Sequence, residues 1–160
     1  DLEVVARFFW SVRHQELSHD QKKRIIQYWE RCVIWSRTLS SPPGKLLSAL
    51  STLSTYLTTA DGGERELLEA AAPYVHKGHN EDRFFEELLR LVESSPAGVS
   101  SALGKAISAH VPLYDFEGRL KSILLKLAEK GRKEDAILLT ERLRSLPGMQ
   151  DLFDLLTRGH

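Results

Sequence analysis

The feature that most constrains the fold is a series of apolar stripes with the spacing of an α-helix, repeated along nearly the whole sequence. The clearest stripe contains Leu120, Ile123, Leu124, Leu127 and Ala128. Residues three or four positions apart lie on one face of a helix, so each stripe predicts a helix with one buried side. No segment alternates apolar and polar residues over the length of a strand. The sequence therefore predicts an all-α fold without a sheet.

Short breaks divide these stripes into about eight or nine helices. Ser18 and Gln21 have the spacing of a capping box, in which each side chain accepts a hydrogen bond from the other residue's backbone N–H. Ser95, followed by proline, predicts another helix start, and Asp115 is expected to cap a seventh helix. Gly131 is expected directly after the end of that helix, because glycine tolerates a left-handed backbone.

Pairing successive helices gives antiparallel hairpins that begin near residues 2, 43, 80 and 115. Intervals of about 35 to 41 residues are typical of helical repeats. We therefore expect residues 1–160 to form a single helical-repeat domain, an irregular right-handed α-solenoid. Because the chain opens at Asp1, we expect it to be a fragment of a larger protein. A closed helical bundle is the alternative architecture.

The segment Leu127–Ile137 (LAEKGRKEDAI) resembles the junction inside a tetratricopeptide-type repeat. In such a junction one alanine packs at the helix crossing, a glycine makes the turn, and a second alanine starts the returning helix. The hairpin that carries it covers residues 118–145. The earlier units lack this junction, and their longer period and the kink expected at Pro73 are more similar to HEAT-type repeats. The resemblance implies stacked hairpins with a concave surface that binds other proteins.

His76 and His79, followed by Glu81 and Asp82, form the only cluster of metal-binding residue types. Zinc needs three or four ligands that are fixed by further hydrogen bonds. A flexible glycine separates the two histidines, and histidine also suits the negative end of a helix dipole. We therefore interpret the cluster as an ordinary helix terminus and expect neither a metal nor a cofactor.

Cys32 is the only cysteine, so no disulfide can form within the chain. It could be paired with His14 or His19 as nucleophile and base. However, Cys32 lies on an apolar stripe beside Trp29, where a thiol acts as a small hydrophobic group. His110 is expected to be partly buried and hydrogen-bonded on the face of the sixth helix. We expect no catalytic residue and no enzymatic activity.

The 22 Lys and Arg residues balance 22 Asp and Glu residues, so the whole chain is not attracted to nucleic acids or anionic membranes. One region, from Arg119 to Lys133, has six basic residues and one acidic residue. Its Arg119, Lys126 and Lys130 are candidate residues for a partner surface. The stripe could follow a phosphate backbone, but it lacks interleaved aromatic residues for base stacking. We therefore expect a protein partner and no nucleic acid.

The distribution of charge on the central helices gives two further expectations. The carboxylates of the fifth helix should pair with arginines along that same helix, and the residues concerned are Glu86, Glu87 and Glu93 with Arg83 and Arg90. From Ser94 to Tyr114 the only charged residue is Lys105. Surface helices normally carry charges opposite their apolar face. This segment is therefore either an internal layer of the domain or the floor of a partner groove.

The N-terminal helix has apolar residues around most of its circumference. A terminal repeat of a solenoid needs a polar outer face. We therefore expect Phe9 or Trp10 to pack against a preceding repeat, or against a second copy of the chain in a homo-oligomer.

These observations favour a protein–protein interaction or scaffolding module built of helical hairpins. The alternative is a structural or regulatory C-terminal segment of a large multidomain prokaryotic protein, such as a defence-type NTPase, which would bind the neighbouring domains of its own chain. No apolar run approaches the roughly 20 residues that span a bilayer, and we expect a cytoplasmic location.

Overall fold

The computed structural model describes residues 17–47, 49–50, 72–78 and 81–158, together with Val4 and Glu69. All regular structure in these residues is helical, and none of them forms a strand. The predicted all-α class is therefore confirmed. The helices are α2 (His19–Thr38), a segment helical at residues 44–47 and 49–50, α5 (Glu81–Leu91), α6 (Pro96–Ser108), α7 (Glu117–Glu129), α8 (Lys133–Arg142) and α9 (Met149–Thr157), with 3₁₀ helices η1 (Ala72–Gly78) and η2 (Tyr114–Phe116).

The described residues hold seven α-helical segments, fewer than the eight or nine that the sequence predicts. The expected N-terminal helix, and most of the third and fourth, lie outside the described residues. The end of the expected fourth helix is the 3₁₀ helix η1. Pro73 lies in its first turn, and proline cannot continue an α-helix because it lacks a backbone N–H and clashes with the preceding turn.

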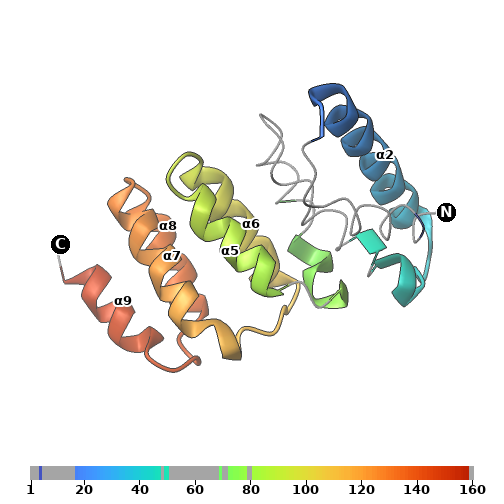
Figure 1. Cartoon of the computed structure of the whole chain (residues 1–160). Helices are drawn as coiled ribbons and strands as arrows, with labels where there is room; N and C mark the ends of the chain where they lie inside the picture. The colour runs from blue at the N-terminus through green and yellow to red at the C-terminus, as the bar shows by residue number, and fades with distance from the viewer. Residues whose placement is uncertain are drawn as a thin grey trace.

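The helices follow one another in a row from α2 at one end to α9 at the other (Figure 1). Each helix packs mainly on elements near it in sequence. In one layer α5 packs on α7, and α7 packs on α9; in the other layer α6 packs on α8. Helix α6 also packs against η1, and α8 packs against both α7 and α9. The hairpins α5–α6 and α7–α8 therefore lie side by side.

The main apolar core runs without interruption from Ala72 to Leu156. A second, smaller core lies under α2, where Trp29 and Val33 pack against Leu50. The Trp29 indole donates a hydrogen bond of 2.9 Å from Nε1 to the Leu50 carbonyl, so its buried polar atom is satisfied. Tyr74 of η1 packs against this smaller core, whereas its neighbours in η1 belong to the main one. Helix η1 therefore joins the two cores.

The predicted helix starts are confirmed at two positions and wrong at a third. Ser18 and Gln21 make both hydrogen bonds of the capping box. Ser95 is the N-cap of α6 and proline follows it, although the Ser95 side chain makes no capping bond. Asp115 does not cap α7: the N-cap is Phe116. The reason is the short η2 helix, which places Asp115 inside a 3₁₀ turn and starts α7 two residues later.

Helices α6 and α7 end in the same way, with a left-handed residue after the last turn. Gly131 follows α7 with φ +80°, as predicted, and the N–H groups of Gly131 and Arg132 donate to carbonyls of the last turn. His110 takes the equivalent position after α6 with φ +56°. The prediction of a partly buried His110 is wrong, because α6 ends at Ser108 and the side chain is exposed.

We expect His110→Gly to stabilise the protein by about 0.5–1 kcal/mol, because a side chain in the left-handed region is strained and glycine is not. The matched substitution Gly131→Ala should destabilise by a similar amount. Urea unfolding followed by circular dichroism measures both. An unchanged or lower stability for His110→Gly would mean that the imidazole makes a compensating contact.

We expect Leu124→Ala to destabilise the protein by about 2–5 kcal/mol, because its side chain is fully buried where α7 meets its neighbours. The adjacent Leu125, more than a third exposed on the same helix, provides the control. Leu125→Ala should cost less than about 1 kcal/mol. Equal losses in a denaturant melt would contradict the assigned face of α7.

Candidate interaction surfaces

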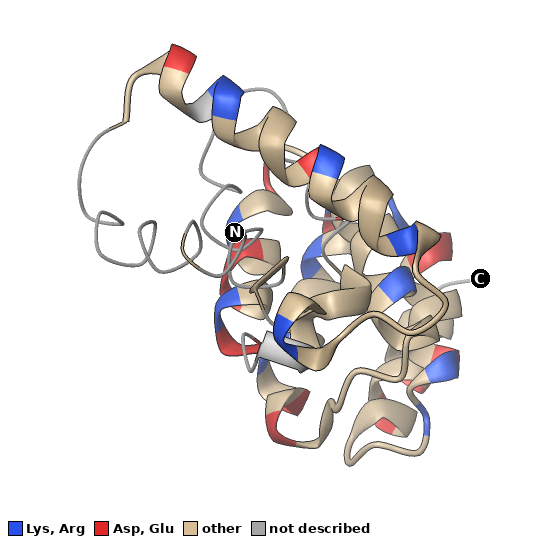
Figure 2. Cartoon of the chain, turned by 90° about the vertical axis from the view of Figure 1, so that its right-hand side faces the viewer, with Lys and Arg blue, Asp and Glu red and all other residues tan. Residues whose placement is uncertain are grey.

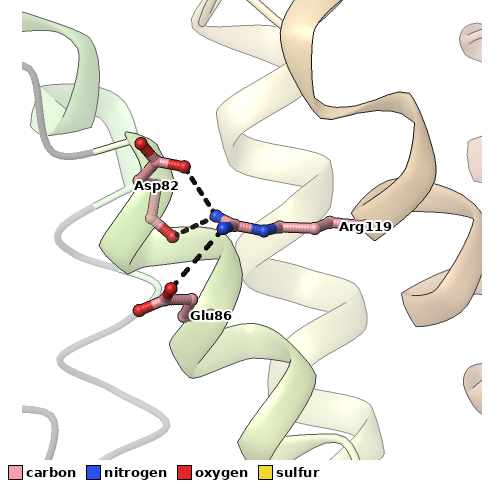
Figure 3. Close-up of polar contacts among 3 residues, drawn as sticks. All are labelled: Asp82, Glu86 and Arg119. Carbon is pink, nitrogen blue, oxygen red and sulfur yellow. Dashed lines mark hydrogen bonds and ion pairs between the residues drawn. The ribbon is translucent and has the colours of Figure 1, made fainter.

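The basic residues that the sequence singles out, Arg119 and Lys126 of α7 and Lys130 at its C-cap, all face carboxylates of α5 or of the turn that follows it. The Arg119 guanidinium donates to the Asp82 carboxylate at 2.7 Å and to the Asp82 carbonyl at 3.0 Å (Figure 3). Its second terminal nitrogen lies 3.5 Å from the Glu86 carboxylate. Arg119 therefore joins the first turn of α7 to the first two turns of α5.

At the other end of the two helices, Lys126 and Lys130 both hold Glu93. Lys126 Nζ lies 3.2 Å from Glu93 Oε1, and Lys130 contacts Oε2. Hydrogen bonds from Lys130 and Lys126 lower the pKa of the Glu93 carboxyl, and the bond to Glu93 raises the pKa of Lys130. The three predicted basic residues thus form an ion-pair ladder with α5 and with Glu93 in the turn after it. They stay more than a third exposed, and their contact with a partner remains a prediction.

The ladder corrects the expectation that the α5 carboxylates pair along their own helix. Glu87 does so, with Arg90 at 2.9 Å, whereas Glu86 and Glu93 reach α7 instead. A sequence signal for this existed. Asp82, Glu86 and Glu93 have the spacing i, i+4 and i+11, and Arg119, Lys126 and Lys130 have the spacing i, i+7 and i+11. Each spacing corresponds to one face of a helix, although α5 ends at Leu91 and Glu93 lies in the turn after it.

The charge-poor helix α6 is mainly an internal layer. It packs against η1, α5 and α8, and within it only Lys105 and Ser108 are exposed. Its edge with α8 is polar: Ser100 donates to the Asp135 carboxylate at 3.0 Å, and Arg142 donates to the Ser108 hydroxyl at 2.8 Å. A surface depression of about 350 Å³ lies on this edge, lined by Ser100, Asp135, Leu138, Leu139, Glu141 and Arg142.

Leu138 gives this depression an apolar rim, because its side chain is 61% exposed. Leu155 of α9 is exposed to a similar degree. A single exposed leucine is common on soluble proteins and indicates nothing by itself. Leu138, however, lies at a surface depression, and the two features together make this place a candidate contact point for a peptide or a neighbouring domain.

Helix α2 carries a further exposed surface that the sequence analysis did not identify. Opposite its buried face, Arg24, Arg31, Ile34 and Trp35 are all exposed. Figure 2 shows α2 as the long helix across the top, with basic residues along it. The sequence does contain a signal for this surface. The segment His19–Thr38 has five Lys and Arg residues but only two Asp and Glu residues.

The candidate nucleophile and metal-ligand residues do not assemble into a site within the described residues. Cys32 is half-buried, and burial together with a hydrogen bond to Cys32 raises the pKa of Tyr28. His76 Nδ1 lies 3.1 Å from Glu81. No group of three or more potential metal ligands occurs among the described residues. Candidates outside the described residues are His14, His79, Phe9 and Trp10.

The chain matches no protein-family model, no curated protein and no solved structure. Within the part of the chain that the structure describes, no helix is both long and apolar enough to cross a bilayer.

We expect the double variant Lys126→Ala with Lys130→Ala to raise the pKa of Glu93, because the lowered value depends on these two donors. Carbon-13 NMR titration of the carboxyl group measures the change. The folded-state pKa lies below the unfolded one, so the stabilisation is present at neutral pH and is lost as pH falls through the folded pKa. Lys121→Ala with Lys133→Ala is the control and should leave the titration unchanged. An unaltered Glu93 pKa in the first variant would contradict the ladder.

Proposed function

We propose that this chain is a protein–protein interaction or scaffolding module, built as an irregular right-handed solenoid of helical hairpins. One observation carries the proposal: polar contacts between neighbouring units join residues at a nearly constant sequence separation. In the α5–α7 layer, Asp82–Arg119 spans 37 residues and Glu86–Arg119 spans 33. In the α6–α8 layer, Ser100–Asp135 spans 35 residues.

The constant separation distinguishes two ways of packing helices. Antiparallel neighbours pair the start of one helix with the end of the next, so the separation changes steadily along the contact. Parallel neighbours pair start with start and end with end, so the separation stays the same. Arg119 and Lys130 follow the second pattern against Asp82 and Glu93. The hairpin α7–α8 is thus placed as a shifted copy of α5–α6, which supports a repeat array over a closed bundle.

The same separation extends to the preceding unit. Lys105 of α6 pairs with Glu69 at 3.2 Å, and the two residues are 36 positions apart. Three successive units therefore make equivalent contacts with one shift of about 36 residues, within the period range of helical repeats. This supports one continuous domain from Glu69 through α8, since each unit needs its neighbour to bury its apolar face; a single domain over residues 1–160 extends this to the rest of the chain.

A repeat array of this kind offers extended surfaces for binding other proteins. Stacked hairpins leave long continuous surfaces on both layers, and such surfaces serve as binding scaffolds in other repeat folds; this step is an analogy at the level of the fold. The exposed apolar residues of α8 and α9 and the depression beside Leu138 are consistent with it.

The proposal is tested by purifying the tagged chain from its own organism after cross-linking in the living cell. We expect defined partner proteins, and we expect Leu138→Glu to deplete at least one of them, because it places a charge in an apolar contact. Ser145→Glu, on an exposed residue, introduces the same charge as a control. Recovery of the chain without any stoichiometric partner would contradict the proposed function.

A further inference from the structure

The outer face of α2 carries exposed residues with the spacing expected where a second helix packs alongside. Arg24, Arg31 and Trp35 lie at positions i, i+7 and i+11, a spacing that places them on one face of the helix. Ile34 flanks Trp35, and the two side chains are 64% and 54% exposed. Trp29, on the opposite face, is 1% exposed. The stripe therefore points away from the core under α2.

The same spacing occurs on α7, where the structure shows what covers it. Arg119, Lys126 and Lys130 also lie at i, i+7 and i+11, and carboxylates of α5 and of the turn directly after it pair with all three. On α2, by contrast, Arg24 and Arg31 have no ion pair with any residue that the structure describes. The helix carries three more basic than acidic residues in a chain with equal numbers of both. Among the described residues, no acidic side chains pair with the basic face of α2 as the carboxylates of α5 pair with α7.

We propose that this face of α2 is the docking surface for an acidic amphipathic helix of another protein, which lies against α2 as α5 lies against α7. The contact between α5 and α7 indicates where the partner helix should carry its carboxylates. Arg24 corresponds to Arg119 and takes carboxylates at positions i and i+4 of the partner helix, and Arg31 takes one at i+11. Trp35 stands where α7 has Lys130, so the last turn of the partner helix presents an apolar residue. This inference rests on the proposed function and names the partner of one surface.

A protein helix fits the face better than the other two candidates. Arginine and tryptophan are the residues most enriched at the energetic centres of protein interfaces, and Ile34 adds apolar area that a phosphate backbone does not use. A single aromatic residue also offers only one stacking position for a nucleic acid base. The α5 helix of a second copy has the right charges, but its own α7 already holds them.

The probe is a fluorescent synthetic helical peptide with glutamates at i, i+4 and i+11 and leucines at i+14 and i+15. A control peptide has glutamine in place of each glutamate. Anisotropy with the full 160-residue chain should show binding of the acidic peptide that weakens with added salt. We expect Arg24→Glu with Arg31→Glu, and separately Trp35→Ala, to weaken it by about tenfold or more. The matched variant Lys133→Glu with Arg158→Glu, on α8 and just after α9, should change it by less than about twofold.

Circular dichroism melts of every variant check that the fold is intact. This is expected because Arg24, Arg31, Trp35 and Arg158 are exposed, and Lys133 is partly exposed at the first residue of α8. Equal binding of both peptides, no binding, or binding unchanged by the α2 variants would overturn the proposal. So would a single-stranded oligonucleotide that displaces the peptide and depends on the same two arginines, since the face would then bind nucleic acid. Peptide binding lost only in the α8–α9 variant would overturn the α2 assignment while leaving the interaction module in place.

Discussion

The packing of each hairpin against the next is the constraint on which the rest of this structure depends. A two-helix hairpin exposes one apolar face, and only a neighbouring hairpin can cover it. The main core accordingly runs as one body through α5, α6, α7, α8 and α9. Within this core Phe85 packs edge-on against Phe84 of the same helix, with ring centroids 5.4 Å apart, and against Phe116 at 4.9 Å. Phe116 is the N-cap of α7, so the second contact joins α5 to the start of the following hairpin.

The ion-pair ladder is mainly a consequence of this alignment of the hairpins and only to a small extent its cause. Once α5 and α7 lie parallel, the same turns of the two helices face each other, and Arg119 meets Asp82 while Lys130 meets Glu93. Exposed ion pairs of this kind add little to stability because solvent screens them, and they contribute far less than a buried leucine. Their effect is on specificity: a helix with the wrong charges would place like charges side by side, which disfavours that pairing.

The sequence predicts what is local and fails where two segments must be placed together. The all-α class, the Ser18 capping box and the Gly131 turn follow from residues within one or two helical turns of each other. Asp115 and His110 were assigned wrongly because a helix boundary two residues away changes the environment of a side chain completely. The ion pairs of Glu86 and Glu93 could not be predicted from local spacing alone. The matching spacing of carboxylates and cations becomes informative only once α5 is known to pack on α7, because the partners are 33 or more residues away.

The two described tryptophans of α2 show why one helix can serve both stability and binding. Trp29 is buried and its indole N–H is bonded to Leu50, so this residue belongs to the core and cannot be altered without loss of stability. Trp35 lies six positions further along, on the other side of the helix, and more than half of its side chain is exposed. A large exposed aromatic beside Ile34 adds little to folding, because it removes little apolar area from water. Its energetic contribution therefore comes mainly from whatever covers it, and the two neighbouring arginines determine the charge that such a partner must carry.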